Sequence, residues 1–344
     1  MTDTCRKNKL RVGIIGCGKI TETRHAPEYA ACENVEIIGY FDFKKERAAA
    51  LAARFGGRVF SSVEELLACP EIDAVSVCTA NVTHAEITVA ALTAGKHVLC
   101  EKPMATTLAE CSEMLSAARE CGKRLAVAHN QRMCTVHRKA RELLAAGVIG
   151  RPLTFKSCFG HSGPDNWSVD TGTGNWFFDK TKSAFGAVAD LGIHKIDLVR
   201  FLLGSEIEAV AAMLGTLDKC YPDGTPVSVD DNAVILCRMK NGVTGCVTVS
   251  WTYYAQEENH TTVYGTEGRM HIDPATGCIT VTKKGGNTDR ILAPQGASTG
   301  VIDTFVSAVL DNTPCDLDAE TVFPSMQAMM VAIESAAAGK QVTL

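Results

Sequence analysis

The sequence lacks the features that would direct it to a membrane, a secretory route or nucleic acid. No uninterrupted apolar run is long enough to span a bilayer. The polar and basic stretch Met1 to Lys9 lacks the apolar segment of a signal peptide. A net charge of -5 gives no reason to expect nucleic acid or an anionic membrane as a partner. We therefore expect a cytoplasmic protein with neither of those partners.

Paired cysteines, internal repeats and low-complexity tracts are missing as well. The 15 cysteines are an odd number, and none of them forms a Cys-x-x-Cys pair. Several lie inside apolar strand-like runs, among them Cys78, Cys100, Cys237 and Cys246. We interpret them as reduced, buried, small hydrophobic residues. Because clustered ligands are also missing, we predict no metal site.

The first part of the chain alternates short apolar runs with helix-like segments. With 344 residues, 46% of them hydrophobic, the chain is long enough to form two domains with ordinary cores. Six short buried runs separated by helices are typical of a doubly wound parallel sheet, so the sequence predicts an α/β domain over residues 1–130. The predicted strands are 10–15, 35–41, 59–60, 74–78, 97–100 and 125–128. Capping-box spacing predicts helix starts at Ser61 with Glu64 and at Thr107 with Glu110.

After residue 130 the pattern changes to that of an α+β domain. From Glu206 to Thr282 most segments alternate with period two and are separated by turns such as Asn241-Gly242. A loop rich in Gly, Asp, Trp and Phe precedes a predicted helix over Gly186 to Leu203, and two helices close the chain. We predict an open-faced, mostly antiparallel β-sheet with helices over residues 131–344.

A glycine-rich turn follows the first predicted strand and opens a helix. Gly16 allows the tight turn, and Gly18 lets backbone N–H groups approach a pyrophosphate at the helix N-terminus. Lys19 and Ile20 belong to the same turn. The third position of the fingerprint is usually Gly or Ala and is Thr21 here, so we expect slightly looser packing there. In this context the motif predicts dinucleotide binding.

The residues after the second and fourth predicted strands indicate which dinucleotide binds. A carboxylate at Asp42 accepts hydrogen bonds from the ribose hydroxyls and repels a 2′-phosphate, which favours NAD. The basic residues after it could hold the phosphate of NADP instead, although they also fit a solvated helix face. Thr79 and Asn81 can flank the ribose and nicotinamide, a role compatible with capping a helix. We interpret His84 as a structural residue under the loop.

Glu101-Lys102-Pro103 follows the fifth predicted strand. In an open parallel sheet the carboxyl ends of the strands are where ligands bind, and every neighbouring strand also delivers polar groups to this edge. A lysine that merely lies in a solvated loop is the simpler alternative. Because polar groups from several strands meet at this edge, we favour a catalytic role for the positive charge of Lys102.

In the second domain, Asp190, His194 and Asp197 fall at i, i+4 and i+7, on one predicted helix face. Asp190 can hydrogen-bond His194 and set its tautomer, which is the arrangement of a general base with its orienter. A histidine on such a helix is more often a core residue, and a metal-binding pair would need a third ligand that is not evident. We favour a structural role for Asp197.

Three segments together resemble the Gfo/Idh/MocA family of oxidoreductases: Gly16–Ile20, Ala94–Pro103 and Asp190–Asp197. The resemblance covers essentially the whole chain. It implies a Rossmann domain followed by an open-faced sheet domain, and it implies Lys102, Asp190 and His194 as the catalytic groups. It also implies a cis Lys102-Pro103 peptide and pairing through the sheet face, as a homodimer or homotetramer.

The candidate site residues fall into three groups. The predicted catalytic residues are Lys102, Asp190 and His194. The predicted cofactor-binding residues are Gly16, Gly18, Lys19, Ile20, Asp42, Thr79, Asn81, Glu101, Lys102 and Trp176. The predicted substrate-binding residues are Lys102, Asn130, Trp167, Asp190 and His194. Trp167, Trp176 and Phe177 offer faces on which a sugar ring can stack, whereas Phe185 stands where the family commonly shows glycine.

These observations predict an NAD-dependent dehydrogenase that oxidises a secondary hydroxyl of a cyclic polyol, sugar or sugar derivative. One alternative is an enzyme that keeps its NAD, oxidises a sugar transiently and cleaves a glycoside. Another is a dinucleotide-bound sensor without catalysis, which would have no need of Lys102, Asp190 and His194 together.

Overall fold

The structure is a computed structural model that describes residues 9–344. The expectation about a signal peptide concerns residues 1–8 and lies outside the described residues. The described chain forms two compact units. Unit 1 comprises the residues up to Ala128 and Gly300–Val322, and unit 2 comprises His129–Thr299 and Phe323–Leu344. The functional division at residue 130, with NAD binding before it and substrate binding and oligomerisation after it, stays a prediction.

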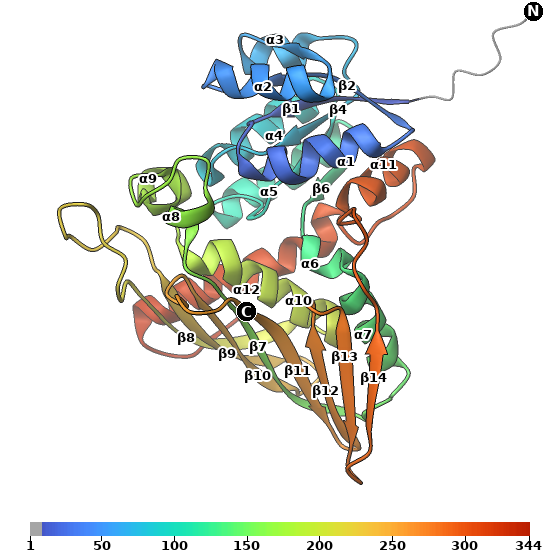
Figure 1. The fold of residues 1–344 in the computed structure, drawn as a ribbon, viewed down its shortest axis with the longest axis vertical. Coiled ribbons are helices and arrows are strands. Elements are labelled where there is room, and N and C mark those ends of the chain that lie inside the picture. The colour runs from blue at the N-terminus through green and yellow to red at the C-terminus, as the bar shows by residue number, and fades with distance from the viewer. Residues whose placement is uncertain (1–8) are drawn as a thin grey trace, which may run out of the picture. The chain divides into compact units, whose positions relative to one another are not determined.

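Unit 1 is built on a six-stranded parallel sheet with the order β3-β2-β1-β4-β5-β6 (Figure 1). The predicted doubly wound α/β arrangement is therefore confirmed. The chain runs outward from β1 in one direction and from β4 in the other, so the order reverses between these two strands. Ligands bind at the carboxyl ends beside such a reversal. The strands are β1 (Leu10–Ile15), β2 (Val35–Phe41), β3 (Arg58–Val59), β4 (Ala74–Val77), β5 (His97–Cys100) and β6 (Leu125–Val127).

The helices of unit 1 bury the apolar runs of the strands on both faces of the sheet. Val12, Ile14 and Val75, for example, have no exposed surface. Fully burying such a side chain contributes roughly 1.5–3 kcal/mol. The helical segments are η1 (Thr21–His25, a π-helical turn), α1 (Ala26–Ala31), α2 (Lys45–Phe55), α3 (Val63–Ala68), η2 (Asn81–Thr83), α4 (His84–Thr93), α5 (Leu108–Glu120) and α11 (Val301–Asp311).

The two predicted capping boxes had different outcomes. Thr107 and Glu110 form a complete capping box at the start of α5, as predicted. The prediction for α3 was wrong by one residue, because Ser62 is the N-cap and accepts from the backbone N–H of Glu65. Ser61 and Ser62 are adjacent, and so are Glu64 and Glu65. The spacing alone therefore does not show which serine caps the helix.

Unit 2 contains a nine-stranded sheet with the order β14-β13-β12-β11-β7-β10-β9-β8-β15. All neighbouring strands are antiparallel except β7 and β10, which confirms a mostly antiparallel sheet. The short strands β14 and β15 were not predicted, since their sequences are polar or terminal. The strands are β7 (Pro152–Gly160), β8 (Ile207–Gly215), β9 (Asn232–Met239), β10 (Thr244–Ser250), β11 (Glu258–Gly265), β12 (Gly268–Asp273), β13 (Cys278–Lys283), β14 (Thr288–Leu292) and β15 (Val342–Thr343).

The sheet of unit 2 is covered by helices on one face. Residues of β9 alternate between buried and exposed, so its other face is open, as predicted. Among the described residues, no helix is both long and apolar enough to cross a membrane. The helical segments are α6 (Asn130–Met133), α7 (Thr135–Ala145), α8 (Pro164–Trp167), η3 (Trp176–Phe178), α9 (Lys180–Ser183), η4 (Val188–Gly192, a π-helical turn) and α10 (Ile193–Leu203), while α12 (Ala319–Ala338) belongs partly to each unit.

The helix predicted over Gly186 to Leu203 differs from the expectation in two ways. It begins with the π-helical turn η4 before it continues as α10. Every residue from Gly186 to Leu202 is buried, so the helix has no solvated side. A π-helical turn carries more residues than an α-helical turn, and spacing at i and i+4 therefore does not fix the relative direction of Asp190 and His194.

Candidate active site

The glycine turn after β1 has the geometry that a dinucleotide needs. Gly16 has a positive φ of 94°, and a Cβ there would come within 2.5 Å of the Cys78 carbonyl oxygen. At Gly18, by contrast, a Cβ would meet no protein atom within 4 Å. The protein does not need this glycine for its own packing, so the space beside it suits a pyrophosphate at the start of the helix. These residues fit the predicted cofactor.

Thr21 does not loosen the turn, contrary to our expectation. It is fully buried, and its hydroxyl donates to the Gly16 carbonyl oxygen at 2.6 Å. The side chain thereby fastens the helix to the tight turn. The first helical hydrogen bond runs from the Glu22 N–H to the Gly18 carbonyl, at 3.0 Å. Lys19 is exposed and pairs with Glu22 at 3.2 Å.

The Asp42 carboxylate lies directly beside this turn. It accepts hydrogen bonds from the backbone N–H groups of Cys17 and Lys44, both at 2.7 Å. Two backbone donors therefore hold the carboxylate in one orientation at the end of β2. A carboxylate at this point of a Rossmann fold can accept hydrogen bonds from ribose hydroxyls.

A pocket of about 490 Å³ opens next to Asp42. It is bounded by the residues that follow β2 and β3 and by the start of α4. Phe43 is 87% exposed and packs edge-on against Phe41, with 5.5 Å between ring centroids. An exposed aromatic ring at the rim of a pocket offers a stacking surface for a flat ligand. Sequence reasoning missed Phe43, although its place directly after Asp42 was a usable signal.

The loops that follow β4 and β5 are joined by His84. Its ring nitrogens lie 2.8 Å from the Pro103 carbonyl oxygen and 3.1 Å from the Thr79 carbonyl oxygen. Burial lowers the pKa of His84. A neutral imidazole has one N–H, so it donates to only one of these oxygens at a time. Asn81 begins η2 and is buried beside this loop. The structural interpretation of His84 agrees with these contacts.

The peptide between Lys102 and Pro103 is cis, as predicted. Glu101 is buried at the end of β5, and its carboxylate is directed into unit 1. One oxygen lies 2.9 Å from His25 Nε2, and the other accepts from the Lys102 backbone N–H at 3.2 Å. Sequence reasoning missed His25, which lies in the helix opened by the glycine turn.

In unit 2, Asp190 is anchored to the sheet. Its carboxylate accepts from the Trp251 indole N–H at 3.1 Å, and its exposed fraction is 9%. The start of the helix is fixed by Asp230, which accepts from the N–H groups of Gly186 and Val188 at 2.8 Å and 2.7 Å. Burial raises the pKa of Asp230 to about 6. Sequence reasoning did not identify either partner.

Asp197 has the structural role that we favoured. Its carboxylate receives a bidentate pair of hydrogen bonds from Arg132 at 2.6 Å and 2.7 Å, and a third from Ser325 at 2.8 Å. Burial alone would raise the pKa of Asp197, but His129 and Arg132 hold it below its usual value. These charges are buried together in unit 2.

A series of aromatic rings leads from His194 to the loop before its helix. The His194 ring lies 6.2 Å from that of Phe159, and Trp176 stacks on Phe177 with a centroid distance of 3.9 Å. We call this series the ring ladder; it comprises Phe159, His161, Trp167, Phe177 and Trp176. The structure therefore places both predicted tryptophans in one aromatic cluster with His194.

The structure shows less about Asn130, Asp165 and Phe185. Asn130 is half-buried at the start of α6. Asp165, in the aromatic loop, pairs with the buried Lys219 at 2.9 Å and so anchors that loop. Phe185 is half-buried next to Gly186, where a Cβ would overlap the Asp230 carbonyl oxygen. This part of the loop is thus tightly constrained by its neighbours.

Lys195 was also missed. It is fully buried, donates to the Asn259 side-chain oxygen at 2.6 Å and lies 5.6 Å from the Phe159 ring centroid. Burial lowers its pKa to about 7. No feature of the sequence apart from its place next to His194 points to this position.

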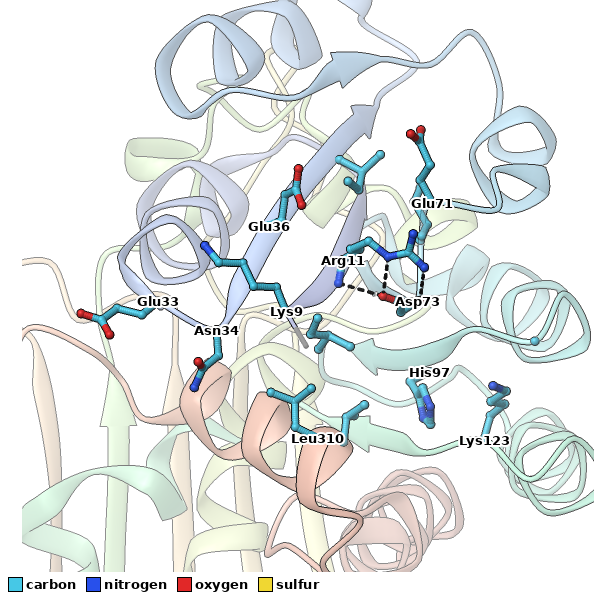
Figure 2. A pocket seen from close by; sticks show the side chains of 15 residues that line it. Lys9, Arg11, Glu33, Asn34, Glu36, Glu71, Asp73, His97, Lys123 and Leu310 are labelled. Carbon is cyan, nitrogen blue, oxygen red and sulfur yellow. Dashed lines mark hydrogen bonds and ion pairs between the residues drawn. The ribbon is translucent and has the colours of Figure 1, made fainter. Parts of the chain in front are cut away.

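A second pocket, of about 1290 Å³, lies in unit 1 at the amino-terminal ends of the strands (Figure 2). Its walls carry charges of both signs, and Arg11 and Asp73 form an ion pair at 2.7 Å on one wall. The pocket lies at the opposite end of the sheet from the glycine turn, and none of the predicted site residues lines it.

Both halves of the chain match known families. Residues 10–129 match the oxidoreductase family with an NAD-binding Rossmann fold, and residues 137–271 match the GFO/IDH/MocA C-terminal domain. The chain belongs to the Gfo/Idh/MocA family of oxidoreductases. It is therefore an oxidoreductase with an NAD-binding Rossmann domain, as the resemblance implied.

Named relatives act on sugars and polyols. The chain is 30% identical to 1,5-anhydro-D-fructose reductase of Ensifer adhaerens over 89% of this chain and 90% of that protein. It is 27% identical to myo-inositol 2-dehydrogenase of Thermotoga maritima, over 77% and 75%. Among solved structures, levoglucosan dehydrogenase with NADH and levoglucosan matches with a TM-score of 0.87 and 26% identity, over 97% of this chain and 99% of that one.

Proposed function

We propose that the protein is an NAD-dependent dehydrogenase that oxidises a secondary hydroxyl of a cyclic polyol, a sugar or a sugar derivative. The observation that carries this proposal is the convergence at one edge of the unit 1 sheet. The open glycine turn, the fixed Asp42 carboxylate and the loop of Lys102 follow β1, β2 and β5. This is the edge where open α/β sheets bind ligands.

The proposed mechanism divides the work between three side chains. His194 accepts the proton of the substrate hydroxyl, and Asp190 orients His194. Lys102 stabilises the negative charge that develops on the hydroxyl oxygen. The nicotinamide of bound NAD supplies the hydride acceptor. In unit 2, the Trp251 and Asp230 contacts described above hold Asp190 and the start of its helix in place.

The cofactor is proposed to be NAD, with NADP less favoured, because Asp42 is held rigidly beside the turn. The adenine ring would occupy the pocket next to Asp42 and stack on Phe43. The remaining proposed contacts come from Gly16, Gly18, Lys19, Ile20, Thr79, Asn81, Lys102 and Trp176. Glu101 was also predicted to contact the cofactor, but its carboxylate lies inside unit 1, and we assign it a different role below.

The substrate class is proposed from the relatives and from the ring ladder. The relatives' names refer to an anhydrosugar, an inositol and levoglucosan. Trp167 is 37% exposed and belongs to the ring ladder that leads to His194, so it offers a face on which a sugar ring can stack. We propose that Trp167 and Asn130 bind the substrate together with the three catalytic residues.

We further propose that a second copy of the chain covers the open face of the unit 2 sheet. Met213, Val234 and Leu236 are 80%, 46% and 56% exposed on neighbouring strands of this sheet. An apolar sheet face of this kind favours association. Leu236→Asp should weaken a homodimer or homotetramer, which sedimentation measures.

From its composition, we propose that the protein is cytoplasmic.

The proposed function is tested by NADH production across inositols, aldoses, sugar acids and glycosides. We expect net NADH release with a free polyol or sugar and far less with Lys102→Ala. Glycoside cleavage without NADH release would instead support the enzyme that retains its NAD. Tight NAD binding without any turnover would support the sensor.

A further inference from the structure

A buried chain of hydrogen bonds runs through unit 1 from α1 to the end of β5. The hydroxyl groups of Tyr29 and Ser76 lie 2.9 Å apart, and the Ser76 oxygen lies 3.2 Å from His25 Nδ1. On its other side, His25 Nε2 lies 2.9 Å from the Glu101 carboxylate. The exposed fractions of these four residues are between 0% and 9%. This series of hydrogen bonds is therefore shielded from solvent.

The last link reaches the loop of the proposed catalytic lysine. The second Glu101 oxygen accepts from the Lys102 backbone N–H at 3.2 Å. His25 is the last residue of η1, the helical turn that follows the glycine motif. These hydrogen bonds thus connect the helix of the proposed pyrophosphate site to the backbone that carries Lys102.

His25 and Glu101 lie at ion-pair distance, with 2.9 Å between Nε2 and the nearer carboxylate oxygen. Burial alone would lower the pKa of His25, but its contacts with Cys78 and Glu101 raise that pKa well above its usual value. Burial would likewise raise the pKa of Glu101, whereas His25 and Lys102 lower it. A buried ion pair adds little stability compared with apolar packing of the same shape. Its presence here calls for a role other than stability.

The charge of Lys102 already acts on Glu101. If the imidazolium were removed, the full negative charge of Glu101 would act on Lys102, which is its neighbour in the sequence. A lysine drawn to that carboxylate is less able to stabilise an alkoxide. We propose that His25 is a positioning residue for Lys102, because it holds the Glu101 side chain in place and offsets its negative charge. This inference rests on the proposed function, in which Lys102 stabilises the alkoxide.

His84 provides a matched control. It is a buried histidine that contacts the same loop, but through the carbonyl oxygens of Pro103 and Thr79. Replacing His84 would loosen the loop without removing the charge that offsets Glu101. If His25 only kept the loop from loosening, His84→Gln should lower kcat in the same way, and Glu101→Gln should rescue neither variant.

The kinetic test uses His25→Gln, Glu101→Gln and the double variant. His25→Gln should lower kcat by about 10- to 100-fold, the scale on which misplacement of a reacting group acts, with little change in NAD affinity. The double variant should recover most of this loss, because a neutral amide pair replaces the ion pair. Glu101→Gln should not rescue His84→Gln. Native kcat in His25→Gln, or a double variant no better than His25→Gln, would overturn the proposal.

A second measurement does not depend on any substrate. Reductive methylation of the Lys102 amine at fixed pH, followed by mass spectrometry, should be slower in His25→Gln and should recover in the double variant. Unchanged labelling would contradict the proposal even if no substrate is known. If the wild-type protein oxidises no polyol or sugar, the proposed function fails, while the labelling still decides the role of His25.

Thermal unfolding shows whether each variant is folded. If His25→Gln does not fold, Ser76→Ala removes only the hydroxyl that contacts His25 Nδ1. It should then slow labelling of Lys102 by about two- to five-fold, on the scale of the net contribution of one hydrogen bond. Labelling at the native rate in Ser76→Ala would count against the proposal.

Discussion

The Asp190 carboxylate accepts a hydrogen bond from the Trp251 indole N–H, with 3.1 Å between the two atoms. Trp251 follows β10 and is fully buried, whereas Asp190 lies in the π-helical turn before α10. The sheet of unit 2 therefore fixes a residue that we propose to orient the general base. The periodicity of the helix alone does not set its position.

Asp190→Asn should lower kcat less than the loss of either reacting group, because it changes an orienting residue and an amide oxygen can still accept from Trp251. Steady-state kinetics with any accepted polyol measure this effect. Asp197→Asn is the control for a carboxylate on the same helix with a structural role, since it removes the negative charge that pairs with Arg132. It should lower the free energy of unfolding by about 3–5 kcal/mol. A larger kinetic loss from Asp190→Asn than from His194→Ala would contradict the assignment.

Lys102→Ala should leave NAD binding measurable and remove most turnover, because the lysine charge is needed only when the alkoxide forms. Loss of one such stabilising group typically costs about 10²–10³-fold in kcat. Titration with NAD and steady-state kinetics separate the two effects. Near-native turnover would show that Lys102 is not the stabilising charge.

His194→Ala should lower turnover by roughly 10²–10⁴-fold, the usual contribution of a general base. Part of the loss should be recovered at high pH, where hydroxide or the ionised substrate replaces the imidazole. A pH profile of kcat for the variant measures this recovery. An equally inactive variant at every pH would argue that His194 acts in some way other than as a base.

Asp42→Ala should weaken NAD binding and relax the rejection of NADP, because a hydrogen-bonding and repelling carboxylate is lost. The bonds to the Cys17 and Lys44 N–H groups are lost as well. Asp42→Asn separates these effects, since it can keep an acceptor for the turn without the charge. Affinity measurements for both cofactors provide the comparison. A wild-type protein that prefers NADP would refute this reading of Asp42.

Lys195→Met should stabilise the protein more at low pH than at high pH. Burial lowers the pKa of Lys195 from 10.5 to about 7, so the folded chain binds fewer protons than the unfolded chain within this window. The penalty for burying the ammonium is full below the window and shrinks by about 1.4 kcal/mol per pH unit as the pH rises through it. Urea unfolding at several pH values measures the trend. A benefit independent of pH would show that burial does not lower the pKa of Lys195.

Most elements of the fold could be predicted because they depend on local pattern. The predicted strands 10–15, 35–41 and 97–100 coincide with β1, β2 and β5. Apolar runs and glycine stops carry that information within a few residues. The family motifs likewise identified the glycine turn, the loop of Lys102 and the helix of His194.

The partners of these residues could not be predicted in the same way. His25 and Glu101 are 76 positions apart, and Asp190 and Trp251 are 61 apart. Such pairs depend on how distant segments pack, and neither spacing nor propensity encodes that in a single sequence. The π-helical turn η4 was missed for a related reason, since an extra residue in a turn leaves no periodic signature.

The distribution of the three tryptophans makes the protein suitable for optical measurements. Trp167 and Trp176 belong to the ring ladder, whereas Trp251 is buried against Asp190. A sugar that stacks on the ladder would change the emission of the first two, and a change in the Asp190 side chain would change that of the third. Single replacements of each tryptophan by phenylalanine would assign these signals, so that sugar binding and the state of the Asp190 helix could be followed separately without a label.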